Sequence, residues 1–316
     1  MAITAAMVKE LRESTGAGMM ECKKALSETN GDMDAAVEFL RKNGQAKAEK
    51  KANRIAAEGL TRICVKDDQT AAVVEVNSET DFVAKNEKFQ AFVEAVAKQA
   101  VDSDAADMDA FMAESWNVDN SKTVQEALVD ITAVISEKIS IRRFEKVVAQ
   151  NGVVVPYLHG EGRIAVLVEA DTNVVNDEIK EACKNIAMQV AALSPKYVDM
   201  SEVSEEYKNH EKEILLAQAT KENEELPEGK RKPQEIIEKM LIGRLNKELK
   251  EICLNEQVYV KAEDGKQTVG QYVQQVAKAT GADFKIKRFV RFETGEGIEK
   301  KNENFAEEVA KQAHLQ

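Results

Sequence analysis

The sequence contains an internal duplication, and this repeat restricts the folds that the chain can adopt. Residues 72–75 (Ala-Val-Val-Glu) resemble residues 166–169 (Val-Leu-Val-Glu), 94 positions further along. The same shift aligns the segments that follow, with Phe89 opposite Cys183. In both copies, turn residues separate alternating apolar runs ahead of a helical pattern. Each copy is therefore predicted to begin with a β-hairpin and to continue into an amphipathic helix.

A second pair of similar segments follows at a different shift. Residues 141–144 (Ile-Arg-Arg-Phe) resemble residues 286–289 (Ile-Lys-Arg-Phe), 145 positions apart, and Thr123 precedes the first pattern as Thr268 precedes the second. These segments predict a helix followed by a third strand. Each copy is expected to be a β-β-α-α-β unit with a three-stranded antiparallel sheet. The two copies are expected to form one α+β core, with helices against sheets.

The change of shift from 94 to 145 positions places 51 additional residues in the second copy, within about residues 194–257. Pro227 and Pro233 divide this insertion, because proline interrupts a helix. Apolar residues at helical spacing predict two helices, with Val203, Tyr207, Ile214 and Ala217 on one and Ile237, Leu241, Leu245, Leu249 and Ile252 on the other. The insertion is therefore predicted to be an antiparallel coiled-coil arm, whose narrow apolar seam also suits a surface that binds another chain.

The segment before the duplication predicts a compact module of three helices in residues 1–45. Thr4 and Asp32 are suitable N-caps, and Gly44, preceded by an asparagine, indicates the end of the third helix. The basic stretch at residues 47–54 predicts a solvated helical connector.

The segment after the duplication predicts a turn and then a short amphipathic helix. Phe305, Val309 and Ala310 share one side of this C-terminal helix. The expected parts are the module and linker at 1–54, the first repeat at 55–144, the second repeat at 145–198 and 257–293, the arm at 199–256, and a C-terminal module at 294–316.

Composition excludes several classes of protein. The chain has 316 residues, 43% of them hydrophobic, and a net charge of -12, which argues against a general nucleic-acid binder with a basic face for phosphates. Four widely spaced cysteines predict buried, reduced thiols rather than a zinc or redox site. No apolar run approaches the roughly 18 residues of a transmembrane helix. The first helical pattern begins too early for a targeting segment, so a cytoplasmic location is expected.

Motifs for catalysis are not found. Gly229-Lys230 lacks the spacing and the following hydroxyl residue of a phosphate-binding loop, and no Gly-x-Ser-x-Gly sequence occurs. A histidine-based site could use only His159, with Glu161 beside it, and the many carboxylates are typical of solvated helix faces. We therefore expect no enzyme, no catalytic residue, no metal and no cofactor.

One loop differs between the two copies. The first predicted hairpin leads into Thr80-Asp81-Phe82-Val83, whereas the second copy has Val174-Val175-Asn176 in the place of the first three residues. The scaffold therefore does not require an aromatic residue there. Two interpretations remain: Phe82 and Val83 staple the next helix, with Asp81 or Thr80 as its cap, or an Asp beside a Phe on a rigidly held loop is inserted into a partner.

Several motifs together resemble the elongation factor Ts family. Residues 15–26 (Thr-Gly-Ala-Gly-Met-Met-Glu-Cys-Lys-Lys-Ala-Leu) are similar to its N-terminal signature, and residues 75–84 contain its second signature. His159-Gly160, residues 186–188 and residues 291–300 extend the similarity over essentially the whole chain, in the order of the family. The predicted arm departs from the familiar form in being longer, with a highly charged tip at residues 222–232.

The resemblance implies both a fold and a partner. It implies a ubiquitin-associated-like N-terminal module, a two-part α+β core, a coiled-coil arm that can join two copies of the chain, and a C-terminal module. It also implies that the chain promotes nucleotide exchange on the GTPase elongation factor Tu, in its GDP-bound and nucleotide-free forms. In the family, the loop corresponding to Thr80, Asp81, Phe82 and Val83 disturbs the magnesium site beside GDP. The further contacts implied are Lys9, Met19, Met20 and Lys23 on the GTPase domain and His159 on another domain of the partner.

Three other functions follow from the residues alone. A coiled-coil scaffold would bind through the arm and would not depend on Phe82. A free-standing binder of ubiquitin-like folds or nascent chains would act through residues 1–45 without the core. An enzyme would have to use His159 and Glu161, although a single exposed histidine on a hairpin turn rarely has a catalytic role.

Overall fold

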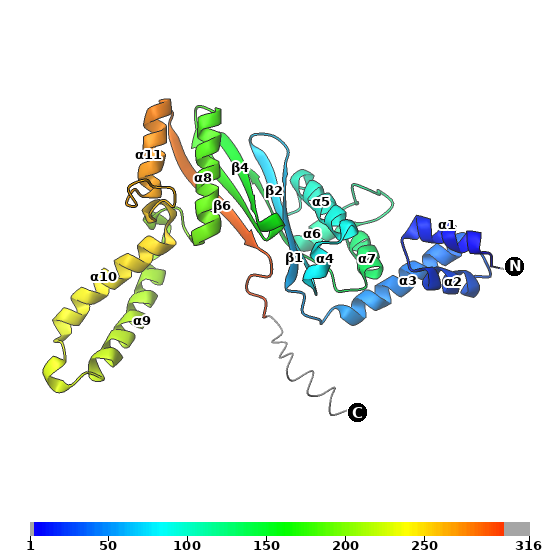
Figure 1. Cartoon of the computed structure of the whole chain (residues 1–316), viewed down its shortest axis with the longest axis horizontal. Coiled ribbons are helices and arrows are strands. Elements are labelled where there is room, and N and C mark those ends of the chain that lie inside the picture. The colour runs from blue at the N-terminus through cyan, green and yellow to red at the C-terminus, as the bar shows by residue number, and fades with distance from the viewer. Residues whose placement is uncertain (1–2, 300–316) are drawn as a thin grey trace.

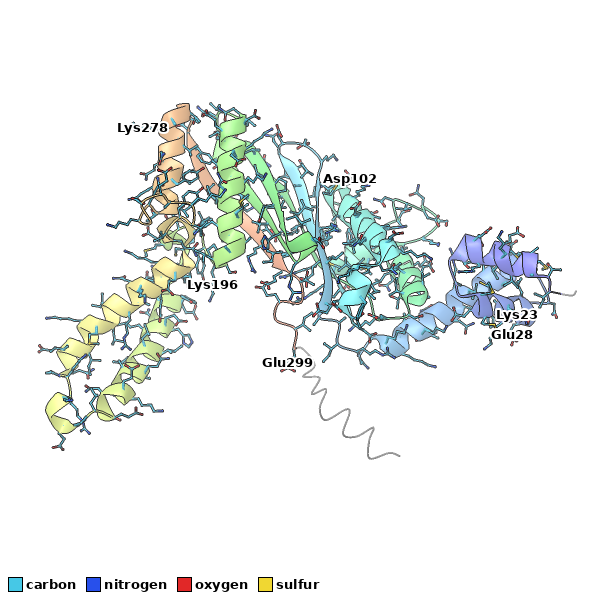
Figure 2. All side chains as sticks on the ribbon, in the orientation of Figure 1. Lys23, Glu28, Asp102, Lys196, Lys278 and Glu299 are labelled. Carbon is cyan, nitrogen blue, oxygen red and sulfur yellow. The ribbon has the colours of Figure 1, made fainter. Side chains whose placement is uncertain are left out.

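The computed structural model describes residues 3–299 and shows an elongated molecule. The N-terminal module lies at one end, the helical arm lies at the other, and two sheets with their covering helices lie between them (Figure 1). Lys23 on the module and Lys196 at the base of the arm therefore lie on opposite sides of the sheets (Figure 2). Surfaces of the module and of the arm are thus far apart in space.

The N-terminal module consists of three helices, as predicted. Thr4 and Asp32 cap the first and third helices through their side chains. Leu11, Cys22 and Leu26 are fully buried between the helices. The helices are α1 (Ala5–Thr15), α2 (Met19–Glu28) and α3 (Met33–Lys51).

The predicted end of the third helix at Asn43-Gly44 is wrong. Helix α3 continues through Gly44 to Lys51, so the module and the connector share one helix. Gly44 is buried, and a Cβ atom added there would lie 3.5 Å from the Cβ of Ala133 in α7 (Val124–Ile135). Packing against the core thus outweighs the weak helix propensity of glycine.

The two predicted sheets are present, each with three antiparallel strands. The first sheet has the order β1-β2-β3, and the second has the order β4-β5-β6. In each sheet a hairpin is completed by a strand from further along the chain. The strands are β1 (Glu58–Val65), β2 (Thr70–Ser78), β3 (Ser140–Val148), β4 (Gly152–His159), β5 (Ile164–Thr172) and β6 (Phe284–Glu293), and a single 3-10 turn, η1 (Gly160–Gly162), joins β4 to β5.

The sheets pack against each other, and helices cover their outer faces. Ala71, Val73, Leu167 and Phe292 belong to the apolar cluster between the sheets. Two larger clusters join each sheet to its own helices, which gives a layered α+β core. The helices that cover the sheets are α4 (Asp81–Ala84), α5 (Glu87–Asp102), α6 (Met108–Ala113) and α7 in the first repeat, and α8 (Asp177–Leu193) and α11 (Val269–Thr280) in the second.

Helix α6 and the loop after it were not predicted as structured elements. Trp116 in that loop is buried, and its ring centroid lies 5.7 Å from that of Phe92 on α5. Phe111 of α6 is fully buried and packs on Phe144 of β3, with 4.5 Å between the ring centroids. The segment between α5 and α7 therefore closes the core of the first repeat.

The insertion is an antiparallel helical hairpin, as predicted. It contains α9 (Glu205–Glu224) and α10 (Gln234–Ile252), and both project away from the sheets (Figure 1). Short 3-10 turns, η2 (Met200–Glu202), η3 (Glu228–Lys230) and η4 (Leu254–Glu256), lie before, between and after the two helices. Ile237, Leu241 and Leu249 are buried along the predicted seam of α10.

The predicted seam of α9 is wrong in part. Ile214 and Ala217 are exposed, whereas Leu215 and Ala219 are buried against α10. Ile214 lies seven residues after Tyr207 and Leu215 lies eight after it, and the structure buries the second position. Val203 is buried but precedes the N-cap Ser204, so it lies outside the helix.

The described chain ends in a turn that follows β6. Residues 294–298 form this turn, and Thr294 donates its backbone N–H to the carbonyl oxygen of Arg163. The predicted C-terminal helix with Phe305, Val309 and Ala310 lies outside the described residues.

Candidate functional site

The loop after β2 forms a short helix that presents one aromatic side chain to solvent. Phe82 in α4 is 78% exposed, the highest value among the exposed large hydrophobic residues of the described chain. The next residue, Val83, is buried in the core of the first repeat. Two adjacent apolar residues thus face in different directions.

These positions distinguish between the two interpretations of the loop. Val83 packs beneath the helix as a staple residue would, but Phe82 does not. Asn86, not Asp81 or Thr80, caps the following helix α5 by accepting the backbone N–H groups of Lys88 and Phe89. The stapling role therefore applies to Val83 alone, and the side chain of Phe82 is exposed to solvent.

The base of the loop is fixed to neighbouring segments. A carboxylate oxygen of Glu79 accepts the backbone N–H of Lys138 at 2.6 Å. The Arg54 guanidinium forms an ion pair with the same carboxylate at 3.3 Å. Because Arg54 follows helix α3, the connector from the N-terminal module ends at the base of the loop that carries Phe82.

The predicted contact residues of the N-terminal module are accessible. Met19 is 58% exposed and Met20 is 73% exposed, both in the first turn of α2. Lys9 and Lys23 are also exposed. The core of the module is formed by other residues, so these two methionines contribute little to its folding.

His159 lies at the end of β4, on the hairpin that joins β4 to β5. It is exposed, and its Nδ1 atom lies 3.0 Å from the Tyr157 hydroxyl. The turn that follows His159 lies against the other sheet, because the Thr61 hydroxyl of β1 donates to the carbonyl oxygen of Gly162 at 2.8 Å.

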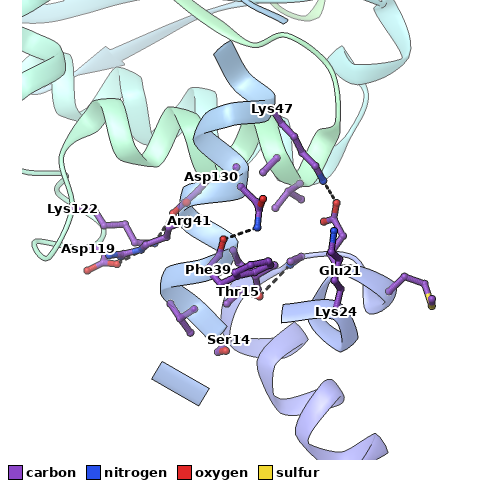
Figure 3. Close-up of a pocket in the computed structure, with 18 residues that line it drawn as sticks. Ser14, Thr15, Glu21, Lys24, Phe39, Arg41, Lys47, Asp119, Lys122 and Asp130 are labelled. Atoms are coloured by element: carbon purple, nitrogen blue, oxygen red, sulfur yellow. Dashed lines mark hydrogen bonds and ion pairs between the residues drawn. The ribbon is translucent and has the colours of Figure 1, made fainter. Parts of the chain in front are cut away.

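A groove of about 680 Å³ separates the N-terminal module from the core (Figure 3). The side chains of Glu21 and Lys47 form a hydrogen-bonded ion pair on one side of this groove. Lys122 forms an ion pair with Asp130 at 2.6 Å on the other side. Its charged groups are thus largely engaged with each other, and we do not identify it as a site of chemistry.

The histidine, carboxylate and cysteine side chains of the described residues are the remaining groups to consider. Within residues 3–299, no three histidine, cysteine, aspartate or glutamate side chains are grouped as they would be around a metal ion. Burial raises the pKa of the Cys183 thiol to about 12 and raises that of Cys22 as well, so both remain protonated at neutral pH. Cys64 differs from the prediction of a buried thiol, because it lies on the edge strand β1 and is only half-buried.

Comparison with known proteins decides the family. A family model described as "Elongation factor TS" matches residues 79–296. The chain is 55% identical to elongation factor Ts of Clostridioides difficile and 51% identical to that of Clostridium novyi, in each case across 98% of both chains.

The chain belongs to the elongation factor Ts family. The protein from Clostridium tetani with the same name is 49% identical across 98% of this chain. The resemblance found in the sequence motifs is therefore confirmed, and membership assigns the chain to translation elongation. None of the helices in the described part of this family member is long and apolar enough to cross a membrane.

Sequence reasoning missed the residues that hold the loop of Phe82. Neither Glu79 nor Glu137 was selected, although both carboxylates bond to segments that are distant in sequence. The signal that could have identified Glu137 was the repeat itself. At the shift of 145, Glu137 aligns with Ala282, so a charged residue occupies a position at which the second copy requires none.

Proposed function

We propose that the chain is a guanine-nucleotide exchange factor for elongation factor Tu. It binds the GDP-bound and nucleotide-free forms and promotes GDP release by inserting Phe82 beside the magnesium and phosphate site. Thr80, Asp81 and Val83 form the rest of this loop. The observation that carries the proposal is the exposed Phe82 next to the buried Val83, on a turn held by a rigid sheet.

Linkage explains how binding releases a nucleotide. A factor that binds the nucleotide-free GTPase more tightly than the loaded form weakens nucleotide binding by the same factor. Changing a population from 1:99 to 99:1 requires roughly 5.5 kcal/mol, whereas burying one Phe side chain supplies about 1.5–3 kcal/mol. Phe82 alone is therefore insufficient, and further contacts are needed.

The further contacts are proposed on the N-terminal module and on the β4–β5 hairpin. Lys9, Met19, Met20 and Lys23 of the N-terminal module bind the GTPase domain, and His159 binds a second domain of elongation factor Tu. The parts expected from the sequence end at residues 54, 144, 198, 256 and 293, and we propose that each part has its own role. The N-terminal module lies at one end of the molecule and the β4–β5 hairpin lies in the sheets at its centre, so one partner must be large enough to contact both (Figure 1).

No catalytic step is part of this proposal. The chain acts by binding alone, in the cytoplasm, without a cofactor or metal of its own and without direct contact to nucleic acid. The net charge of -12 supports the last point, because a nucleic-acid surface repels a chain of this charge.

The arm is proposed to join two copies of the chain. Ile214 is 38% exposed on α9, and Ile242 is 58% exposed on α10, so the arm has apolar surface beyond its own seam. Sedimentation velocity over a range of concentrations checks this proposal, and a monomer at every concentration would contradict it.

The exchange function is checked by timing the release of fluorescent GDP from purified elongation factor Tu. The wild-type chain should accelerate release strongly, and Phe82→Ala should lower the rate constant by about 10- to 100-fold, the loss expected for a buried aromatic anchor. Complex formation should be partly retained, because the other contacts remain. Val118→Ala is a matched control, since Val118 is 69% exposed on another loop.

The outcomes separate function from mechanism. No acceleration by the wild-type chain would overturn the exchange function and would favour a scaffold that binds through its arm. Equal acceleration by wild type and Phe82→Ala would keep the function but remove Phe82 from the mechanism. Met20→Ala should raise the concentration of the chain that gives half-maximal GDP release, with little change in the maximal rate. The reason is that the lost contact stabilises the initial complex and the transition state for release equally.

A further inference from the structure

Thr80, the N-cap residue of the loop helix α4, is held by a carboxylate from a distant segment. Its backbone N–H donates to one oxygen of Glu137 at 3.0 Å, and its hydroxyl donates to the other oxygen at 2.8 Å. Glu137 lies in the turn between α7 and β3, and both residues are half-buried. Two charge-assisted hydrogen bonds to a single carboxylate fix both the backbone and the side chain of Thr80.

The second repeat provides an internal control for this contact. At its corresponding junction, the backbone N–H of Asp283 donates to the side-chain oxygen of Asn173 at 2.9 Å. In the first repeat, the backbone N–H of Lys138 donates to Glu79 at 2.6 Å in the same way. These two bonds occupy equivalent positions at the shifts of 94 and 145, so this contact belongs to the scaffold of both repeats.

A second contact is also shared by the two junctions. The Ser78 hydroxyl donates to the carbonyl oxygen of Thr80 at 3.0 Å, and the Thr172 hydroxyl donates to that of Val174 at 2.9 Å. The strand-to-helix junction is therefore formed in both repeats by the same pair of hydrogen bonds.

The contact between Thr80 and Glu137 is not shared. Their equivalents in the second repeat are Val174 and Ala282, whose side chains can neither donate nor accept a hydrogen bond. The strand-to-helix junction of the second repeat, which has no exposed aromatic residue, thus forms without this contact. The additional carboxylate occurs only in the repeat that exposes Phe82.

Building on the exchange function proposed above, we infer that Glu137 is a positioning residue for nucleotide exchange. By holding Thr80, it keeps the turn of α4 in the conformation that buries Val83 and directs Phe82 outward. A loop held in its binding conformation before contact loses less conformational entropy on insertion. Without Glu137, only a fraction of the molecules has Phe82 in place, and apparent affinity falls by that fraction.

The experiment compares Glu137→Ala, Glu137→Gln and Asn173→Ala in the full chain. Glu137→Ala removes both acceptors and should lower kcat/KM for GDP release from elongation factor Tu by about 10-fold. Glu137→Gln should remain close to wild type, because its amide oxygen accepts the N–H of Thr80 and its amide nitrogen donates to the hydroxyl. Asn173→Ala removes the scaffold bond of the other repeat and should leave the rate unchanged.

Amide hydrogen exchange of the free chain supplies a measurement that does not depend on the partner. The backbone N–H of Thr80 should exchange faster in Glu137→Ala than in wild type and should be protected again in Glu137→Gln. If Glu137 had a merely structural role, Asn173→Ala and Glu137→Ala would lower kcat/KM for GDP release equally.

The failures of the two proposals can be distinguished. A wild-type chain that does not release GDP overturns the exchange function and, with it, the role of Glu137. Acceleration by wild type and Glu137→Ala alike overturns only the positioning role. The positioning role is also overturned if Glu137→Ala leaves the protection of the Thr80 amide unchanged.

Discussion

The two repeats share one frame and differ at one junction. In both, the third strand has one extra residue where it pairs with a buried carboxylate of the central strand: Arg142 of β3 beside Glu75 of β2, and Lys287 of β6 beside Glu169 of β5. Both also begin their last helix with a capping box, at Thr123 and at Thr268. At the strand-to-helix junction, however, the first repeat presents Phe82 in a separate short helix. The second repeat instead leads directly into α8.

The difference shows what the fold itself requires at this position. In the second repeat, the residue equivalent to Phe82 is Asn176, whose side chain accepts the backbone N–H of Ile179 and caps α8. In the first repeat, the cap is displaced to Asn86, and the residues gained by this displacement form α4. One copy therefore uses the junction to stabilise a helix, and the other uses it to present an exposed aromatic residue on the same frame.

The largest expected effect concerns the buried carboxylates. Glu75 is fully buried and accepts hydrogen bonds from Arg142, Arg143, Asn77 and the backbone N–H of Gly295. Glu75→Ala should lower the free energy of unfolding by about 3 kcal/mol, because it leaves these donors without their acceptor. Urea denaturation followed by circular dichroism measures the loss.

The equivalent carboxylate of the second repeat is expected to matter less. Glu169 bonds to Lys287 and Arg288, which are each 43% exposed, whereas Arg142 and Arg143 are 29% and 31% exposed. Water can therefore replace the lost partner more easily, and Glu169→Ala should cost about 2 kcal/mol. Equal losses in the two variants would show that the additional bonds of Glu75 contribute nothing.

A smaller effect distinguishes the two junctions. Asn176→Ala removes the cap of α8 and should lower the free energy of unfolding by about 1 kcal/mol without changing GDP release. Phe82→Ala should change the free energy of unfolding by less than about 0.5 kcal/mol, because the side chain is exposed. Urea denaturation and nucleotide-release kinetics on both variants test these opposite patterns. A large loss of stability in Phe82→Ala would mean that Phe82 is a folding residue after all.

The strands and the repeat could be predicted because their signals are local. Apolar alternation and turn residues occur within short segments, and the copies support each other. The end of α3 could not be predicted in this way, since Gly44 indicates a helix end locally but lies within α3, beside Ala133 of α7. Local patterns also do not contain the contact between Thr80 and Glu137, which joins residues that are 57 positions apart.

The exposure of Phe82 could be predicted only in part from the sequence. A staple residue and a partner-binding residue have the same sequence pattern ahead of a helix, so only packing distinguishes them. The structure assigns the buried position to Val83, the neighbour of Phe82. The repeat alignment indicated that the aromatic residue was dispensable for the scaffold, but it could not indicate which of the two apolar side chains would face solvent.

The smallest expected effect concerns the ends of the two equivalent helices α7 and α11. Each ends in a left-handed residue, Ser136 with φ 65° in the first repeat and Gly281 with φ 64° in the second. Glycine adopts this conformation without the steric cost that a side chain incurs. Ser136→Gly should therefore raise the free energy of unfolding by about 0.5 kcal/mol, and Gly281→Ser should lower it by a similar amount. Thermal unfolding of both variants tests this, and nucleotide release should not change in Gly281→Ser.

In Ser136→Gly, the residue next to Glu137 becomes more flexible in the unfolded chain but keeps its native conformation. Slower release in that variant would show that the anchor of Thr80 depends on the rigidity of the preceding residue as well as on the carboxylate.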